Sequence, residues 1–358
     1  MMRAAWLGVV MAVSGIAADR DWEAMAERFV QAVKPRPGER ALARFHRGYF
    51  RELEAPLRKR LKAAKARCDV IDDRQPLPSL DRYTLYFWMP LGEDGRQLDA
   101  REREAMARWL DGGGARRALH VHWSEGTRRP DGLPAAHTPA LDAMYERALA
   151  IDYAALRAAQ DRAIAFLRQG TIRVLTPHGT DLMFRTGVRP WNRQDGDASP
   201  ERAASARLRV DRDIEYPAGV IRVAPIELTP HGVLALPEMR VGAATARQVK
   251  LYFDNGRISA VKAAEGQAEV EAYLKENGES AMHFREFALG LNPELVPPPD
   301  AAVIPYFGYG AGVVRISLGD NEELGGSIRG GFTRWFFLPD ASVHVDNRYL
   351  VRGGRLAP

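Results

Sequence analysis

The segment Tyr83-Thr84-Leu85-Tyr86-Phe87-Trp88-Met89 decides the fold of the first half of the chain. This dense apolar and aromatic run predicts a buried strand. The residues at 100–110 have the pattern of a helix, and Asp111-Gly112-Gly113-Gly114 is a strong signal for its end. Residues 119–123 then predict a second strand. This strand–helix–strand order indicates a mostly parallel sheet with helices on its faces.

The residues before this unit extend the same pattern. Trp22, Met25, Phe29 and Val33 recur at helical spacing, and Pro35-Arg36-Pro37-Gly38 ends the helix that they predict. A strand at 41–45, an amphipathic helix at 50–66 and one or two helices at 139–169 complete the series. We therefore expect an N-terminal α/β domain at 19–169.

The chain changes character after Gly170. Short apolar segments separated by turn residues predict a series of strands, and Asp254-Asn255-Gly256-Arg257 is a hairpin signal. One helix, at 267–276, interrupts the series. The second half of the chain, 170–358, is expected to form a β-rich domain.

The composition is that of an ordinary globular protein, with 46% hydrophobic and 27% charged residues among 358. The 51 basic residues exceed the 46 acidic ones by five, but they are spread along the chain. A nucleic-acid reader usually carries a clustered basic face with aromatic platforms, so we expect no nucleic-acid partner. Cys68 is the single cysteine, which excludes an intrachain disulfide and a cysteine-based zinc site.

The first eighteen residues resemble a targeting segment. Arg3 precedes an apolar stretch at 4–18 that is too short to span a bilayer, and Gly15-Ile16-Ala17 offers a small-x-small end. A cleaved signal peptide and an exported protein are one interpretation. The alternative is a helix at 1–18 that packs on the body of a cytoplasmic protein. No other segment suits membrane crossing, so stable membrane insertion is not expected.

Several phrases occur in a fixed order along the chain: Lys34-Pro35-Arg36-Pro37-Gly38-Glu39-Arg40, Pro177-His178-Gly179-Thr180-Asp181-Leu182, Pro217-Ala218-Gly219-Val220, Ala224-Pro225-Ile226-Glu227, Glu286-Phe287-Ala288-Leu289-Gly290, Gly312-Val313-Val314-Arg315-Ile316-Ser317-Leu318-Gly319 and Ser342-Val343-His344-Val345-Asp346. Their order and spacing resemble the thermophilic metalloaminopeptidases of the aminopeptidase T type. The resemblance implies the α/β plus β-rich architecture of that family, a homodimer, and a small-molecule or peptide substrate.

The resemblance also implies five ligands that hold two metal ions. Three of them survive, as Glu286, His344 and Asp346, whereas Val220 and Arg315 stand where the family has Glu and His. His344 and Asp346 are two apart in an expected strand, so both side chains should leave the same face. With Glu286 they would form an open three-ligand site for one divalent ion of zinc, iron or manganese.

Arg315 supports a second interpretation of the same residues. Its planar guanidinium could bind Glu286 or Asp346 bidentately and replace the lost ion electrostatically. The cluster would then serve stability and carry no chemistry. The sequence leaves both alternatives open.

Two further positions are candidates for acid–base roles. His120 and His122 alternate on one strand face, near the strand end where open α/β sheets bind ligands. Either could act as a general base or acid, or simply mark a partly exposed strand end. Glu227 follows the Ala224-Pro225 phrase and could be a general base or a structural acceptor.

Three functional hypotheses follow from these residues. The first is an aminopeptidase-like hydrolase with one metal ion, with Glu227, His122 and Arg315 as catalytic candidates. The second is a mononuclear-iron enzyme similar to the ring-opening dihydroxypyridine dioxygenases, a related branch of the superfamily. The third is a non-catalytic relative that binds a small molecule or peptide in a degenerate site, with Arg315 holding a carboxylate.

Overall fold

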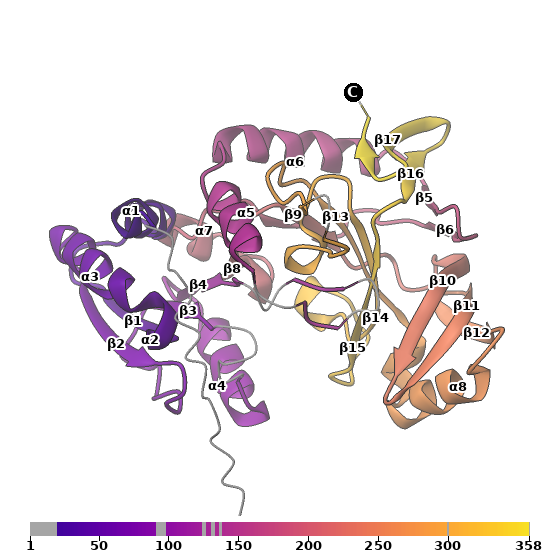
Figure 1. Ribbon diagram of the computed structural model, residues 1–358, viewed down its shortest axis with the longest axis horizontal. Helices are drawn as coiled ribbons and strands as arrows, with labels where there is room; N and C mark the ends of the chain where they lie inside the picture. Colours follow the sequence, from indigo (N-terminus) through magenta and orange to yellow (C-terminus); the bar gives the residue numbers. More distant parts are fainter. Residues whose placement is uncertain are drawn as a thin grey trace, which may run out of the picture.

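The computed structural model describes residues 20–90, 98–123, 127–129, 133–135, 138–298 and 301–357. Residues 1–18, with their two interpretations as a signal peptide or a packed helix, lie outside these ranges. Three sheets organise the described chain. Figure 1 shows the sheet with β1 to β4 at the left, the sheet with β9 and β13 to β15 in the middle, and the sheet with β10 to β12 at the right. No helix within the described ranges has the length and apolar composition needed to cross a bilayer.

The first sheet is parallel throughout and contains five strands. Its spatial order is β2 (Arg67–Asp72), β1 (Arg40–Phe45), β3 (Leu85–Met89), β4 (Arg117–Val121) and β8 (Asp213–Tyr216). The expected parallel sheet is therefore present. The expected domain boundary at 169/170 does not coincide with a boundary between sheets. The strand β8 lies after this boundary in the chain but forms an edge of the first sheet.

Helices cover both faces of this sheet. The first half of the chain contains the helices α1 (Trp22–Val33), α2 (Arg47–Phe50), α3 (Glu54–Ala63), α4 (Ala100–Asp111), α5 (Pro139–Leu149) and α6 (Tyr153–Leu167). Of these, α6 packs its buried apolar residues on the core of the second half instead. One face packs its alternate residues, such as Phe87 and Leu119, against α1, α3 and α5. The other face packs Trp88 and Ala118 against α4. A capping box between Asp99 and Glu102 begins α4 and fixes this covering helix.

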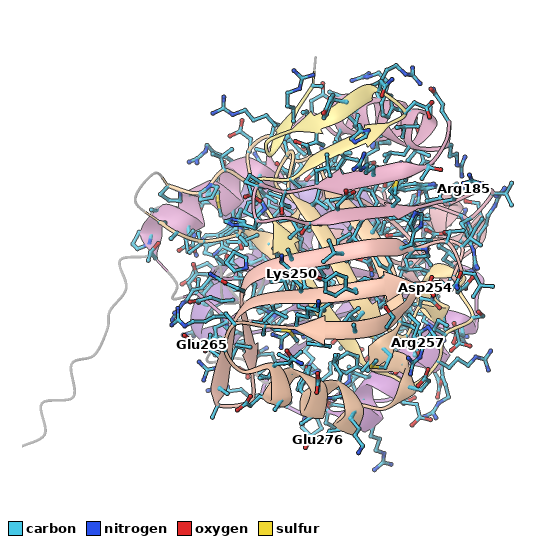
Figure 2. All side chains as sticks on the ribbon, turned by 90° about the vertical axis from the view of Figure 1, so that its right-hand side faces the viewer. Arg185, Lys250, Asp254, Arg257, Glu265 and Glu276 are labelled. Atoms are coloured by element: carbon cyan, nitrogen blue, oxygen red, sulfur yellow. The ribbon has the colours of Figure 1, made fainter. Side chains whose placement is uncertain are left out.

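Two antiparallel sheets form the second half of the molecule. The eight-stranded sheet, seen face-on in Figure 2, has the order β12 (Arg257–Lys262), β11 (Ala244–Asp254), β10 (His231–Val241), β6 (Asp181–Phe184), β5 (Ile172–Leu175), β16 (Ser342–Val345), β17 (Arg348–Arg352) and β18 (Arg355–Leu356). The five-stranded sheet has the order β15 (Thr333–Leu338), β14 (Val314–Gly319), β13 (Phe284–Gly290), β9 (Val220–Val223) and β7 (Asn192–Gln194). The remaining helices are α7 (Pro200–Ala204) and α8 (Gln267–Glu276).

The five-stranded sheet lies between the two other sheets. Phe287 and Leu289 of β13 join the apolar core shared with the eight-stranded sheet. Ala288, between them, joins the core of the first sheet instead. Side chains of β13 therefore alternate between two cores, and those on the side of Ala288 face the parallel sheet. This second face carries the charged residues described below.

A buried arginine connects the first sheet to its surroundings. Arg117, at the start of β4 and 1% exposed, donates to both carboxylate oxygens of Glu39 at 2.8 and 2.9 Å. It also donates to the carbonyl oxygens of Val33 and Ala198, at 2.9 and 2.8 Å. One guanidinium thus holds the end of α1, the start of β1 and the loop before α7 together.

We predict that Arg117→Met lowers the free energy of unfolding by about 3–5 kcal/mol, because the nearly buried Glu39 carboxylate loses its cationic partner and keeps only the neutral donors of Arg36 N–H and Thr84 Oγ1. Urea denaturation followed by circular dichroism measures this change. Arg101→Met, at an exposed position of α4, is the matched control and should change stability by less than about 0.5 kcal/mol. Equal stabilities of the two variants would contradict the role assigned to Arg117.

Candidate functional site

A cavity of 390 Å³ lies where the ends of the parallel strands meet the charged face of the five-stranded sheet. The first sheet contributes Trp88, His120, His122, Asp213 and Glu215, and α4 closes one side. The five-stranded sheet and its loops contribute a second wall, made of Arg222, Phe307, Tyr309, Arg315, Glu323 and Trp335. Pockets at the carboxyl ends of parallel strands are the usual binding places of open α/β sheets.

Strand register brings His120, His122 and Glu215 together. His120 pairs with Glu215 across the parallel strands β4 and β8, and His122 follows two residues later on the same side. The ligand atoms of the three residues all lie within 4.8 Å of one another. Of the His, Cys, Asp and Glu side chains that the structure describes, these three form the one group with the spacing of a metal site.

The two histidines and Glu215 are packed tightly and mostly shielded from solvent. The His120 ring stacks on Trp88 with the centroids 4.0 Å apart, and the His122 ring lies 3.5 Å from that of His120. His120 and His122 are each 7% exposed. Their spacing and burial fix the orientation of both imidazoles within the cavity.

The carboxylates of β8 carry opposite pKa shifts. Burial raises the pKa of Glu215, but the interaction with His122, whose Nε2 lies 3.8 Å from Oε1, outweighs it and the pKa falls to about 2. Burial and then the charge of Glu215 raise the pKa of Asp213 to about 7. Oε2 of Glu215 and Oδ1 of Asp213 are buried and accept no hydrogen bond from the described part of the chain.

The opposite wall is built around the carboxylate of Glu286, which is 0% exposed. Arg315 donates to Oε1 from Nε and Nη2, at 3.0 and 2.6 Å. Arg222 donates to Oε2 from Nε and Nη2, at 3.1 and 2.8 Å, and Arg285 donates to the same oxygen. Burial opposes ionisation here, but the charges of Arg222, Arg315 and Arg285 hold the pKa of Glu286 well below its usual value.

Arg222 retains donors for a further ligand. Its Nη2 also binds Glu323 at 2.8 Å, whereas Nη1 donates to no residue within the described ranges. Arg222 lines the cavity and is 6% exposed. Two N–H groups on Nη1 are therefore available to an oxygen atom inside the cavity.

The structure does not bring together the three residues expected to hold a metal ion. Glu286 lies in β13, whereas His344 lies in β16, an inner strand of the eight-stranded sheet. Asp346 is exposed and follows the end of β16 in a turn, with φ 53°, so it does not share a strand face with His344. The Nδ1 atom of His344 lies 2.6 Å from the carbonyl oxygen of Asp346. The three side chains form no common ligand group.

The other expected site residues have different positions. His122 and Arg315 line the same cavity. Arg315 binds Glu286, which is one of the two alternatives that the sequence leaves open. Glu227 lies outside the cavity, where it pairs with Arg189 and accepts hydrogen bonds from the backbone and hydroxyl of Ser327, at 2.9 and 3.1 Å. These contacts are those of a structural acceptor.

Sequence reasoning missed Asp213, Glu215 and Arg222. The alternation Asp213-Ile214-Glu215-Tyr216 is a strand signal that places two carboxylates on one face, and it could have identified β8. Its pairing with β4 could not be predicted, because α5, α6, α7 and three strands of the other sheets lie between the two strands along the chain. Arg222 gives no local signal of its role.

No protein-family model matches this chain, and no curated protein matches it by sequence. Two solved structures resemble it in fold over nearly its whole length. The 2,5-dihydroxypyridine dioxygenase of Pseudomonas putida KT2440 has a TM-score of 0.63 and 14% identity, over 94% of this chain and 96% of the other. AmpT of Thermus thermophilus has a TM-score of 0.58 and 15% identity, over 94% and 99%.

The chain is a distant fold relative of aminopeptidase T. The mixed α/β architecture of several sheets agrees with that of AmpT, as the sequence resemblance implied. At 14–15% identity the two likenesses show the fold alone. The chemistry of this chain has to be argued from its own side chains.

We predict that Glu286→Gln lowers the free energy of unfolding by about 3–5 kcal/mol, because three buried guanidinium groups lose the charge that they surround. Thermal or urea unfolding measures this change. His344→Ala, which removes one hydrogen bond at a partly exposed position, should cost no more than about 1 kcal/mol. A larger loss in His344→Ala than in Glu286→Gln would reverse this assignment.

Proposed function

We propose that this protein is a metal-dependent hydrolase that holds one divalent ion on His120, His122 and Glu215. The observation that supports it best is the convergence of these three ligand groups in a shielded cavity at the ends of parallel strands. The proposal keeps the single-ion hydrolase expected from the sequence but moves the ion to different residues.

The donor set fits a catalytic ion. Two imidazoles and one carboxylate are a known ligand combination of catalytic zinc sites, in which further coordination positions stay open for water and substrate. The buried Oε2 of Glu215 accepts no hydrogen bond from described residues, so this carboxylate has an unused lone pair. A buried carboxylate oxygen without a partner is costly unless a ligand occupies it.

When bound, such an ion lowers the pKa of a coordinated water towards ~7 and polarises a carbonyl or related oxygen. The residues around it supply the rest of the site. Asp213 lines the cavity, and its Oδ1 is a buried acceptor that no described residue uses; in this proposal it accepts a hydrogen bond from the attacking water. The Nη1 group of Arg222, which has no partner among the described residues, is placed to donate to a substrate oxygen on which negative charge develops.

The size and walls of the cavity favour a small substrate or the end of a peptide. Its volume of 390 Å³ is near the lower end of the range for ligand sites. The rings of Phe307 and Trp335, 5.4 Å apart, form an apolar part of its wall. The homodimer expected from the resemblance remains a prediction.

An iron-dependent oxygenase is the second candidate. Two histidines and one carboxylate with open positions are also the ligand set of non-haem iron(II) oxygenases. The aromatic residues Trp88, Phe307 and Trp335 in the cavity wall would suit a planar ring. We favour the hydrolase over the oxygenase because hydrolysis requires a group that binds water and a donor to the oxyanion. Asp213 would supply the first and Arg222 the second.

We expect isothermal titration to show one zinc ion per chain in the native protein. His122→Gln and Glu215→Gln should each weaken zinc binding by roughly tenfold or more, since each removes one ligand (about 1.4 kcal/mol per tenfold). His344→Ala is the matched control and should bind zinc as the native protein does. Zinc binding that depends on His344 and not on His122 would disprove the proposed site.

Activity after reconstitution separates the two reactions. Zinc-loaded protein should cleave members of an amide and ester panel, and Arg222→Lys, which keeps the charge but loses the Nη1 group, should lower kcat by about tenfold or more. Iron(II)-loaded protein is tested with aromatic substrates for oxygen consumption. Oxygen consumption that needs Glu215, without hydrolysis of any panel member, would favour the oxygenase instead.

A further inference from the structure

A second cavity, of 470 Å³, lies on the other side of the β7 region and shares no lining residue with the one described above. Residues of α6, the β7 segment and the stretch from α7 to Asp211 line it. Four of the lining residues are arginines, Arg168, Arg193, Arg202 and Arg207, and two are aspartates, Asp161 and Asp211. The wall of this cavity therefore has an excess of positive charge.

Both aspartates already form ion pairs with two of these arginines. Asp161 pairs with Arg193, and Asp211 lies 3.5 Å from Nη2 of Arg202. Asp195, behind Arg202, lies 3.4 Å from its Nη1. Even when Asp195 is counted, the four arginines exceed the aspartates by one charge.

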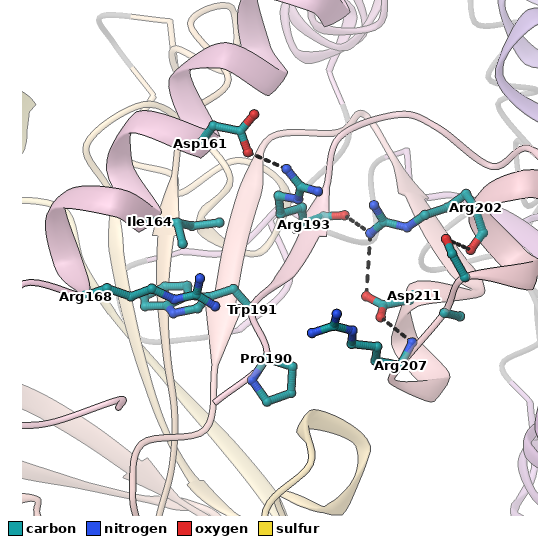
Figure 3. A pocket seen from close by; sticks show the side chains of 11 residues that line it. Asp161, Ile164, Arg168, Pro190, Trp191, Arg193, Arg202, Arg207 and Asp211 are labelled. Atoms are coloured by element: carbon teal, nitrogen blue, oxygen red, sulfur yellow. Dashed lines mark hydrogen bonds and ion pairs between the residues drawn. The ribbon is translucent and has the colours of Figure 1, made fainter. Parts of the chain in front are cut away.

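Two of the arginines have no acidic partner among the described residues. Nη2 of Arg168 reaches only the carbonyl oxygen of Arg189, at 3.3 Å. The guanidinium of Arg207 forms no hydrogen bond or ion pair within the described part of the chain, although its backbone N–H binds Asp211 at 3.2 Å. Figure 3 shows the Arg207 side chain extending from the Asp211 side of the cavity towards Trp191.

The floor of this cavity is flat and apolar. Trp191, Pro190 and Ile164 lie together on one side, opposite Arg202 and Arg207 (Figure 3). Trp191 is 8% exposed, and its Nε1 is a buried donor without an acceptor in the described ranges. An indole N–H that has no acceptor is unusual in a buried position.

We propose that this cavity binds a phosphate monoester with a flat apolar group. The phosphate would lie among Arg193, Arg202 and Arg207, whose guanidinium groups match phosphate oxygens in geometry and charge. The apolar group would lie on Trp191 and Pro190. Arg168, at the exposed edge, adds long-range attraction for the anion. This site does not depend on the proposed metal ion.

The test measures binding of inorganic phosphate and of phenyl phosphate to the full-length protein by isothermal titration. We expect one saturable site that binds phenyl phosphate more tightly than phosphate. Arg207→Gln should weaken both by about tenfold, because it removes one charge-assisted contact. The guanidinium of Arg207 has no partner in the described ranges, so the fold of the variant should be unchanged.

Two controls make the result specific. Arg352→Gln removes the same charge from an exposed position of β17 and should leave both affinities unchanged within about twofold. His122→Gln excludes binding through the other cavity and should also leave both affinities unchanged.

Trp191→Phe tests the apolar floor and should reduce the ratio by which phenyl phosphate binds more tightly than phosphate.

Three outcomes would overturn the proposal. One is the absence of saturable binding of either probe at about 10 mM, a level that corresponds to negligible affinity. Another is an equal loss of affinity in Arg207→Gln and Arg352→Gln, which would indicate non-specific attraction. The third is equal affinity for the two probes, which would mean that the apolar floor takes no part.

Discussion

The buried carboxylate of Glu286 is the constraint on which the centre of the molecule depends. An ionised group without solvent is tolerated only with close compensation, and here three guanidinium groups supply it. They come from β9, β13 and β14, which are neighbours in the five-stranded sheet. A shift in the register of any of these strands would turn an arginine away, so the ion cluster and the strand order support each other.

The same cluster determines where metal chemistry can and cannot occur. Both oxygens of Glu286 are occupied by arginines, which leaves this carboxylate poorly suited to a cation. The facing wall has the opposite character, because Glu215 and Asp213 each carry a buried carboxylate oxygen that accepts no hydrogen bond from the described residues. The wall from the five-stranded sheet therefore carries guanidinium groups, and the wall from the parallel sheet carries the candidate metal-ligand atoms. The sequence resemblance located the first wall, the strand pattern located His120 and His122 on the second, and the structure adds Glu215 and Asp213 to them.

Local patterns in the sequence predicted most elements of the fold but not the contacts that form the site. The helix at 267–276 has the bounds of α8, and Asn255 and Gly256 adopt the positive φ values that their hairpin requires. Such features depend on near neighbours. The pairing of β8 with β4 depends on residues about a hundred positions apart, which no local pattern records. Asp346 lies in a turn after the strand, where an aspartate tolerates the left-handed conformation. The alternation of polar and apolar residues does not predict where the strand ends.

The charges of the cavity link the proposed ion to its substrate. A divalent cation on His120, His122 and Glu215 would lie across the cavity from Arg222 and Arg315, and like charges in a poorly solvated space repel. Glu286 and Glu323 offset this repulsion only in part, because they are already shared among the arginines. An anionic oxygen between the two walls would interact favourably with both. Binding of the ion and of an anionic ligand should then strengthen each other, since the coupling free energy between two sites is reciprocal.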